Sequence, residues 1–341
     1  MIIDIHAHFT APDKLYAFKA NLLASRAHGR GKLKLSDDLI LAALNEPVHG
    51  GTSHLQQLVE VGTDIQIISP RPYQLMHSEH PEAVVRYYTE ACNDLTARQC
   101  QLFPDKFLGM ASLPQSMDTT PAKWVEELER CVKEFGFVGC LLNPDPNENT
   151  HPEPPGLGSE FWYPVYEKLV ELDVPALIHA AGCRAERHSY TLNFVLEESI
   201  AILSLLESRV FDDFPKLKLI ISHGGGAIPY QIGRFRAARG KRADSSFEDD
   251  LRQLYFDTSL YTQDALEMLF RWATPDRCMF GTERPGAGTA KDPVTGKWMD
   301  DTVPLIENIP SLSESDKRKI FSENAVKVFN LKLAALAAGT S

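Results

Sequence analysis

The sequence predicts an α/β fold in which eight parallel strands, each followed by a helix, close into a barrel. Short runs of β-branched residues alternate with longer amphipathic stretches, a pattern typical of repeated strand–helix units around a parallel sheet. Eight such runs can be counted, which is the number that closes a (β/α)8 TIM barrel. The 341 residues exceed most single domains, but a barrel with insertions accommodates them. We therefore expect one domain over residues 1–341.

The expected elements follow one another in regular order. The strands span residues 2–5, 64–69, 107–112, 137–142, 176–179, 217–222, 254–258 and 278–281. The helices between them include 81–102, 121–135, 160–172, 194–211, 262–273 and 313–329. The helix over 121–135 has its ends encoded locally, since Thr120 can cap it, Pro121 tolerates the first position and Gly136 ends it.

Two segments depart from this alternation. Residues 10–51 are too long for an ordinary connection after the first strand, and we expect a mostly helical insertion that acts as a lid over the barrel mouth. Residues 285–299, rich in glycine and proline, predict a long loop after the eighth strand, beside the same mouth. The alanine-rich end, 333–341, is expected to be a fraying helix end.

Composition excludes several classes of protein. Hydrophobic residues make up 43% of the chain and aromatic residues 9%, which suffices for a core, and no apolar run approaches the ~20 residues of a membrane span. A net charge of -11 argues against nucleic acid and anionic membranes as partners. The six cysteines show no CxxC spacing and the N-terminus shows no signal-like segment, so we expect free thiols in a cytoplasmic protein.

The first strand ends in two histidines with dipeptide spacing, in Asp4-Ile5-His6-Ala7-His8. Side chains at i and i+2 of a strand point to the same face, so His6 and His8 can reach one cation together. Imidazole suits a borderline divalent metal such as zinc. The alternative is a pair of exposed histidines near a mobile terminus.

Polar residues also stand at the ends of three later strands. His179 ends the fifth, His223 follows the sixth, and Glu283 follows the eighth. Each alone could be a satisfied core group or a helix cap. Active sites of barrels form at the carboxyl ends of the strands, so their coincidence there predicts one metal site made by His6, His8, His179 and Glu283, with room for water.

These motifs resemble the amidohydrolase superfamily, in its branch of mononuclear decarboxylases and hydratases related to amino-carboxymuconate-semialdehyde decarboxylase. The resemblance covers the whole length and rests on the Asp4–Phe9 motif, His179, Ile221-Ser222-His223-Gly224-Gly225-Gly226 and Phe280–Pro285. No lysine stands at Leu142-Asn143-Pro144, where binuclear members carry their bridging lysine, so the resemblance implies one metal ion. We expect Zn²⁺, with Mn²⁺ as the alternative.

Glu283 is a departure from the aspartate that the superfamily usually has at this place. It narrows the resemblance to the 4-oxalomesaconate hydratase family, which implies addition of water to a carbon–carbon double bond of a tricarboxylate in aromatic-acid catabolism. Glu283 is expected to act as a metal ligand, as the general base, or as both. His223 is expected to be the general acid, and its alternatives are a fifth ligand or a hydrogen bond to a neighbouring strand.

A small anionic polycarboxylate as substrate requires cations at the mouth. Arg71 follows the second strand, and its planar guanidinium can hold a carboxylate with two hydrogen bonds. Arg234 is a second candidate, with a solvated helix face as its alternative. Tyr190 and Asn193 are expected as further substrate ligands because they directly precede the helix expected at 194–211. The backbone N–H groups of residues 224–226 offer an oxyanion cradle. Arg284 is adjacent to Glu283, but strand alternation can turn it away.

Other functions fit parts of the same pattern. A metal-dependent non-oxidative decarboxylase would use the same histidines, and Glu283 in place of aspartate is the feature against it. A lactone or amide hydrolase is disfavoured by the single metal. A non-catalytic metal- or carboxylate-binding barrel would bind ligand without turnover. Helices with apolar faces on related barrels allow a homodimer.

Overall fold

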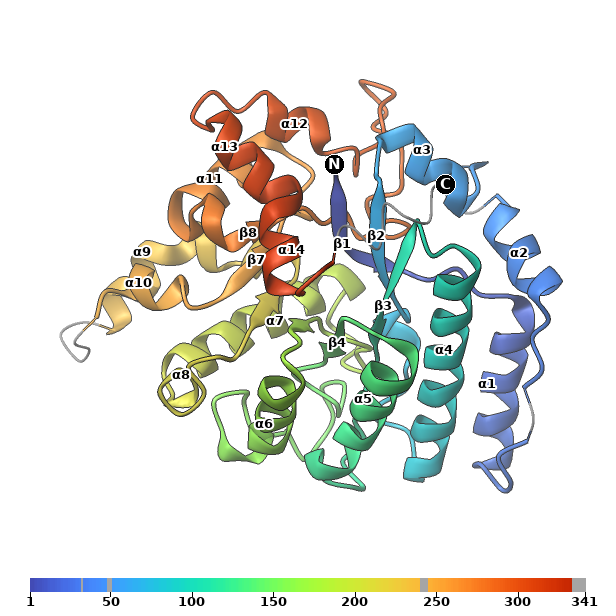
Figure 1. Ribbon diagram of the computed structural model, residues 1–341. Helices are drawn as coiled ribbons and strands as arrows, with labels where there is room; N and C mark the ends of the chain where they lie inside the picture. Colours follow the sequence, from blue (N-terminus) through green and yellow to red (C-terminus); the bar gives the residue numbers. More distant parts are fainter. Residues whose placement is uncertain (32, 48–50, 240–244, 333–341) are drawn as a thin grey trace.

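The computed structural model describes residues 1–31, 33–47, 51–239 and 245–332, and within them the predicted barrel is confirmed (Figure 1). Eight parallel strands are hydrogen-bonded in the order of the chain, β1 to β8. Their bounds are β1 Ile3–His8, β2 Ile65–Ser69, β3 Phe107–Ala111, β4 Gly139–Leu142, β5 Ala176–Ile178, β6 Leu219–Ile221, β7 Tyr255–Asp257 and β8 Cys278–Met279.

The chain that follows β8 is hydrogen-bonded to β1, which closes the sheet into a barrel. The Ile5 N–H donates to the Phe280 carbonyl at 2.9 Å, and the Glu283 N–H donates to the His6 carbonyl at 2.7 Å. The segment from Phe280 to Glu283 therefore lies against β1. This closure brings the first and last strands of the chain, and the chemistry that each carries, to one place.

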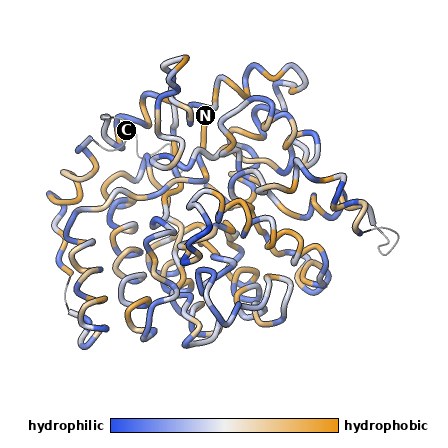
Figure 2. The backbone as a smooth tube through the Cα atoms, turned by 180° about the vertical axis from the view of Figure 1, so that it is seen from behind, coloured by the Kyte–Doolittle hydropathy of each residue, from blue (hydrophilic) through white to orange (hydrophobic). Residues whose placement is uncertain are grey.

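Helices surround the strands. Their bounds are α1 Asp13–Ser25, α2 Asp37–Asn45, α3 His54–Val61, α4 Glu82–Leu102, α5 Pro121–Phe135, α6 Tyr163–Leu172, α7 Tyr190–Leu206, α8 Val210–Asp213, α9 Ile228–Arg239, α10 Phe247–Leu251, α11 Gln263–Ala273, α12 Val303–Glu307, α13 Glu314–Arg318 and α14 Asn324–Val328. Hydrophobic and hydrophilic residues alternate along the outer helices, as expected where one face packs on the barrel (Figure 2).

Several predicted helix ends were wrong. The helix expected over 194–211 begins at Tyr190, because Ser189 caps it by accepting a hydrogen bond from the Leu192 N–H, and it ends before the separate short helix α8. The helix expected over 313–329 is α13 and α14 joined by a π-helical turn, Lys319–Glu323. Thr120 stands at the cap position of α5, but its side chain makes no capping hydrogen bond.

The insertion after β1 is helical, as predicted, and its action as a lid over the mouth stays a prediction. Its first helix is α1. It packs along α4 on the outside of the barrel (Figure 1). Lys19 of α1 lies 5.5 Å from the centre of the Tyr88 ring of α4. The insertion therefore adds an outer layer to one side of the barrel. Residues 285–299 form a loop, as predicted, with one isolated bridge between Lys291 and Trp298.

The barrel interior is apolar at the amino-terminal end of β1 and becomes polar toward the carboxyl end of that strand. Ile3 and Ile5 belong to the inner cluster, together with residues of the other strands and of α14, whereas Ala7 and Phe9 pack outward in a cluster with residues of α1 and α4. A β-bulge between Asp4 and Ala7 accounts for this change of face. Beyond the bulge, the inward positions of β1 are those of the two histidines.

Other expectations concern the chain as a whole. No helix of the described residues is long and apolar enough to cross a membrane. All six cysteines are free, as predicted. The expected fraying end, 333–341, lies outside the described residues.

Candidate metal centre and active site

Four buried side chains converge at the carboxyl end of the barrel. They come from β1, from the residue after β5 and from the segment after β8: His6, His8, His179 and Glu283. Each offers one ligand atom, and these atoms all lie within 4.8 Å of one another. These are the four residues that the sequence predicted as metal ligands.

Hydrogen bonds behind the histidines decide which ring nitrogen faces this centre. His6 Nδ1 lies 2.5 Å from Asp257 Oδ2, and His8 Nδ1 lies 3.1 Å from Ser69 Oγ. His179 Nδ1 donates to its neighbouring carbonyl, that of Ala180, at 2.6 Å. With Nδ1 engaged in each ring, Nε2 is the nitrogen left for the centre.

The donor set fits a divalent metal ion. Nε2 of His6 and of His179 is buried and has no hydrogen-bond partner among the described residues. Burial lowers the pKa of His8 and of His179 well below the ordinary value, so these rings are neutral, the form that binds a metal. Buried polar atoms without partners are rare, and a cation among them would satisfy them.

The backbone places Glu283 at the centre. Its φ of 61° is left-handed, a costly conformation for glutamate that the surrounding hydrogen bonds hold. The Glu283 N–H donates to the His6 carbonyl in β1. The preceding residue, Thr282, donates from its hydroxyl to Asp4 Oδ2 at 2.6 Å and from its N–H to Asp4 Oδ1 at 3.1 Å. Asp4 of the first motif thereby anchors the turn that presents the carboxylate.

Charge keeps Glu283 ionised. Burial alone would raise the pKa of its carboxyl, but the hydrogen bond and charge of His223 hold that pKa well below the ordinary value. Tyr261 also donates its hydroxyl to Glu283 Oε2 at 3.2 Å. Glu283 is thus available as a metal ligand or as a proton acceptor.

His223 lies beside the four-residue set. Its Nε2 is 3.7 Å from Glu283 Oε2, and its Nδ1 is 2.8 Å from Glu198 Oε1. Burial opposes a charge on this ring, but Glu198 and Glu283 raise the pKa of His223 well above the ordinary value. The structure thus places His223 where the sequence predicted it, and its role as general acid stays a prediction.

Two carboxylates of this site were missed from the sequence. Asp257 ends β7 and could have been found by the same strand-end argument as His179, because that strand had been identified. Glu198 lies inside α7, one among many charged residues on helices, and no sequence signal distinguished it. Both are fully buried and each contacts a histidine of the site.

The predicted substrate ligands differ in exposure and in the contacts that they make. Arg71 is 8% exposed, and its Nη1 donates to the Pro285 carbonyl at 3.0 Å, at the edge of the loop beyond Glu283. Asn193 is buried in the first turns of α7, and its Oδ1 has no partner among the described residues. Tyr190 is 45% exposed, with its ring 5.4 Å from that of Tyr73.

The other arginines lie elsewhere. Arg234 is exposed on α9, the alternative that the sequence left open, and its role as a substrate ligand stays a prediction. Arg284 turns away from the centre: it is fully buried and paired with Asp300, while its guanidinium carbon lies 5.2 Å from the centre of the Trp298 ring. It therefore stabilises the loop after β8.

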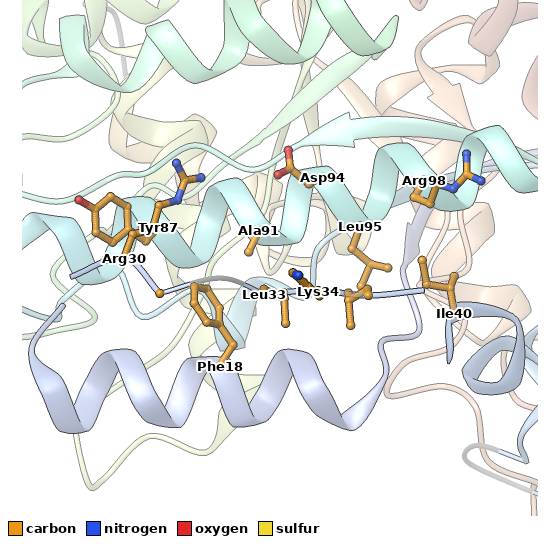
Figure 3. A pocket seen from close by; sticks show the side chains of 12 residues that line it. Phe18, Arg30, Leu33, Lys34, Ile40, Tyr87, Ala91, Asp94, Leu95 and Arg98 are labelled. Carbon is orange, nitrogen blue, oxygen red and sulfur yellow. The ribbon is translucent and has the colours of Figure 1, made fainter. Parts of the chain in front are cut away.

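Two cavities lined by residues of the insertion after β1 contain no residue of the metal set. One of 390 Å³ has Arg71 and Tyr73 at one end and residues of α1 and α2 at the other. The second, of 610 Å³, lies between α1, α4 and the segment around Leu33 (Figure 3). The lining of the second, between the insertion and α4, is mixed apolar and charged and bears no residue of the centre.

The family model for amidohydrolases matches residues 3–331. The chain belongs to the amidohydrolase family. This amidohydrolase is 38% identical over 340 residues to 2-keto-4-carboxy-3-hexenedioate hydratase of a Sphingobium species, covering 96% of both chains. Its fold matches the crystal structure of 4-oxalomesaconate hydratase from Rhodopseudomonas palustris with a TM-score of 0.87 and 36% identity, covering 100% of this chain and 99% of that chain.

Decarboxylases of the same family are also similar to it. A dihydroxybenzoic acid decarboxylase from a Polaromonas species, solved with bound manganese and an inhibitor, is 26% identical, with a TM-score of 0.72 over 97% of each chain. The resemblance to this branch of the superfamily, predicted from the motifs, is confirmed. The similarity to both hydratases extends over nearly the whole amidohydrolase chain.

Proposed function

We propose that this protein is a metal-dependent hydratase that adds water to the carbon–carbon double bond of 4-oxalomesaconate, giving 4-carboxy-4-hydroxy-2-oxoadipate. The observation that carries the proposal is the pairing of Glu283 with His223 beside three convergent histidines. Similarity to two hydratases over nearly the whole chain supports the same reaction.

The proposed cofactor is one Zn²⁺ per chain, with Mn²⁺ as the alternative. His6, His8, His179 and Glu283 would hold it, since three imidazoles and a carboxylate suit zinc and the unpartnered Nε2 atoms need a cation. When bound there, such an ion supplies Lewis acidity, which lowers the pKa of a water molecule toward neutrality.

Glu283 and His223 each carry out one of the two proton transfers. The Glu283 carboxylate accepts a proton from water as the oxygen bonds to the alkene carbon that becomes carbon 4. In the conjugated 3-ene form of the substrate, 2-keto-4-carboxy-3-hexenedioate, the alkene electrons move toward the oxo group to form an enolate, and His223 delivers a proton from Nε2 to carbon 3, next to the oxo carbon. The balance is one water consumed, with its oxygen on carbon 4 and one proton on carbon 3.

The substrate carries three carboxylates, and Arg71 is the proposed principal cation for them. One hydrogen bond of Arg71 to protein is found among the described residues, which leaves most of its five N–H donors for a ligand. Asn193 and Tyr190 lie in the first turn of α7, and the Tyr190 ring lies 5.4 Å from the ring of Tyr73, two residues after Arg71. They are proposed as neutral partners of the remaining oxygens.

Mass analysis of the product tests the proposal. Metal-loaded protein is incubated with 4-oxalomesaconate, with Glu283→Gln as the matched variant. Gain of one water, lost in the variant, supports the hydratase. Loss of carbon dioxide would make the protein a decarboxylase, the alternative that its decarboxylase relatives keep open. Unchanged substrate despite tight metal and ligand binding would favour a binding protein instead.

A further inference from the structure

Helix α7 contributes a buried carboxylate to the site. Glu198 is fully buried, and its two oxygens lie 2.8 and 3.0 Å from His223 Nδ1. One turn earlier on the same helix, Phe194 stacks on the His223 ring, with centroids 5.6 Å apart and planes 12° from parallel. One helix therefore contacts both the edge and the face of this imidazole.

The contact with Glu198 has a consequence for the other side of the ring. A neutral imidazole carries one proton, and a carboxylate at Nδ1 holds that proton at Nδ1. In either protonation state Nε2 is left to face Glu283, whose Oε2 lies 3.7 Å away. The backbone of His223 is itself left-handed, with φ of 50°, a strained conformation that the surrounding structure must hold.

Stability alone does not explain Glu198. Among the described residues, its side-chain hydrogen bonds both go to His223. Burial of a carboxylate is costly, and a well-packed apolar residue of similar volume often serves a core as well or better. A buried acid whose contacts converge on one ring is consistent with a role in orienting that ring.

We propose that Glu198 is the positioning residue of the site: it orients His223 and keeps one proton at Nδ1 before and after transfer, so that the proton given to the reacting carbon is the one at Nε2. This inference rests on the proposed function for the role of His223. The orientation of the His223 ring and the proton at its Nδ1 are expected whatever the substrate is.

The chain offers a matched control at the next position. Glu197 is also a buried acid of α7, but it accepts a hydrogen bond from Asn149 at 2.9 Å instead of from His223. Glu198→Leu removes the acceptor, Glu198→Gln keeps the shape and one neutral acceptor, and Glu197→Gln changes the same charge on the same helix. A general effect of charge or packing in α7 would appear in Glu197→Gln too.

Steady-state kinetics with 4-oxalomesaconate is the first readout. We expect kcat to fall about 100-fold in Glu198→Leu and about 10-fold in Glu198→Gln, with KM within about threefold of the wild-type value, since orientation of a proton donor acts on the chemical step. Glu197→Gln should keep kcat within about twofold. Equal losses in Glu198→Gln and Glu197→Gln would overturn the inference.

Nitrogen-15 NMR of histidine-labelled protein is the second readout, with His223→Asn to assign the signal. For the neutral ring, reached by raising the pH, we expect the proton at Nδ1 of His223 in the wild-type protein and a shift of population to the Nε2–H tautomer in Glu198→Leu. An unchanged tautomer would overturn the inference even if activity falls. If Glu198→Leu does not fold, the isosteric Glu198→Gln carries the kinetic comparison. Absence of any hydration by the wild-type protein would refute the proposed function, while the NMR result would still decide the role of Glu198.

Discussion

Asp257 Oδ2 lies 2.5 Å from Nδ1 of His6, and both side chains are fully buried. The same carboxylate accepts the N–H of Gly224 through Oδ1 at 2.9 Å. Asp257 thus connects the end of β7 to β1 and to the turn that follows β6. Such a carboxylate behind a ligating histidine fixes the ring orientation and raises the basicity of the nitrogen that faces the metal.

Replacement of this carboxylate should weaken metal binding. We expect Asp257→Asn to lower metal affinity about 10- to 100-fold, because the amide no longer supports the basicity of His6. Competition with a chelator of known affinity measures this. Asp249→Asn is the control, since Asp249 is exposed and its side chain contacts Ser246 and Arg252, away from the centre. Equal metal affinity in Asp257→Asn and the wild-type protein would contradict the orienting role.

Removal of the metal should abolish hydration and lower thermal stability together. A ligand that binds only the folded state adds to the free energy of unfolding, and here it also satisfies the unpartnered Nε2 atoms of His6 and His179. We expect the chelated protein to recover both activity and melting temperature on addition of zinc or manganese. Full turnover by a metal-free sample, verified by elemental analysis, would refute the metal-dependent mechanism.

Arg71 should act on substrate binding more than on the chemical step. Loss of a charge-assisted pair typically costs about 1.5–3 kcal/mol, so Arg71→Met is expected to raise KM about 10- to 100-fold. The control is Arg209→Met, because Arg209 is exposed in the segment before α8. A lower kcat with unchanged KM would instead assign Arg71 to the reaction step.

Glu197 should make the free energy of unfolding depend on pH. Burial, and then the charge of Asp145, raise the pKa of Glu197 from 4.5 to about 7. Between these pH values the unfolded state releases a proton that the folded state retains. The contribution of Glu197 to the free energy of unfolding is therefore highest below pH 4.5 and is lost as the pH rises to about 7.

Glu197→Gln should remove this dependence. Relative to the wild-type protein, the variant is expected to gain about 1–3 kcal/mol between acid and neutral pH, as measured by urea unfolding at a series of pH values. The hydrogen bond from Asn149 is retained, since the amide keeps an acceptor oxygen. Parallel stability profiles of the two proteins would show that Glu197 ionises normally in the folded state.

The buried pair of Arg284 and Asp300 should stabilise the loop after β8. Asp300→Asn leaves the guanidinium without its counter-charge in a fully buried place, so we expect a loss of about 3–5 kcal/mol in the free energy of unfolding. Asp292→Asn, at a half-buried position of the same loop, is the control, since the amide keeps an oxygen to accept the N–H groups of Val294 and Thr295. A loss below about 1 kcal/mol would show that the loop relaxes around Arg284.

Strand-end residues were the most predictable part of the site. A polar side chain after a buried β-branched run is visible in one dimension, and barrel topology brings such ends together, so His6, His8, His179 and Glu283 could be placed. Asp257 followed the same rule and was overlooked. The start of α7 was misplaced because Ser189 caps the helix earlier than the apolar pattern suggests, which puts Tyr190 and Asn193 on the helix itself.

The amino-acid pattern by itself determined the fold class, the order of the strands and the identity of the four converging side chains, because periodicity and strand ends are local properties. The tertiary structure decided which atoms face inward. The bulge in β1 turns the histidines into the barrel, and the left-handed backbone at Glu283 depends on Asp4 across the closure. Glu198 meets His223 from a helix 25 residues earlier. Contacts of this kind depend on packing between distant segments, and no local pattern encodes them.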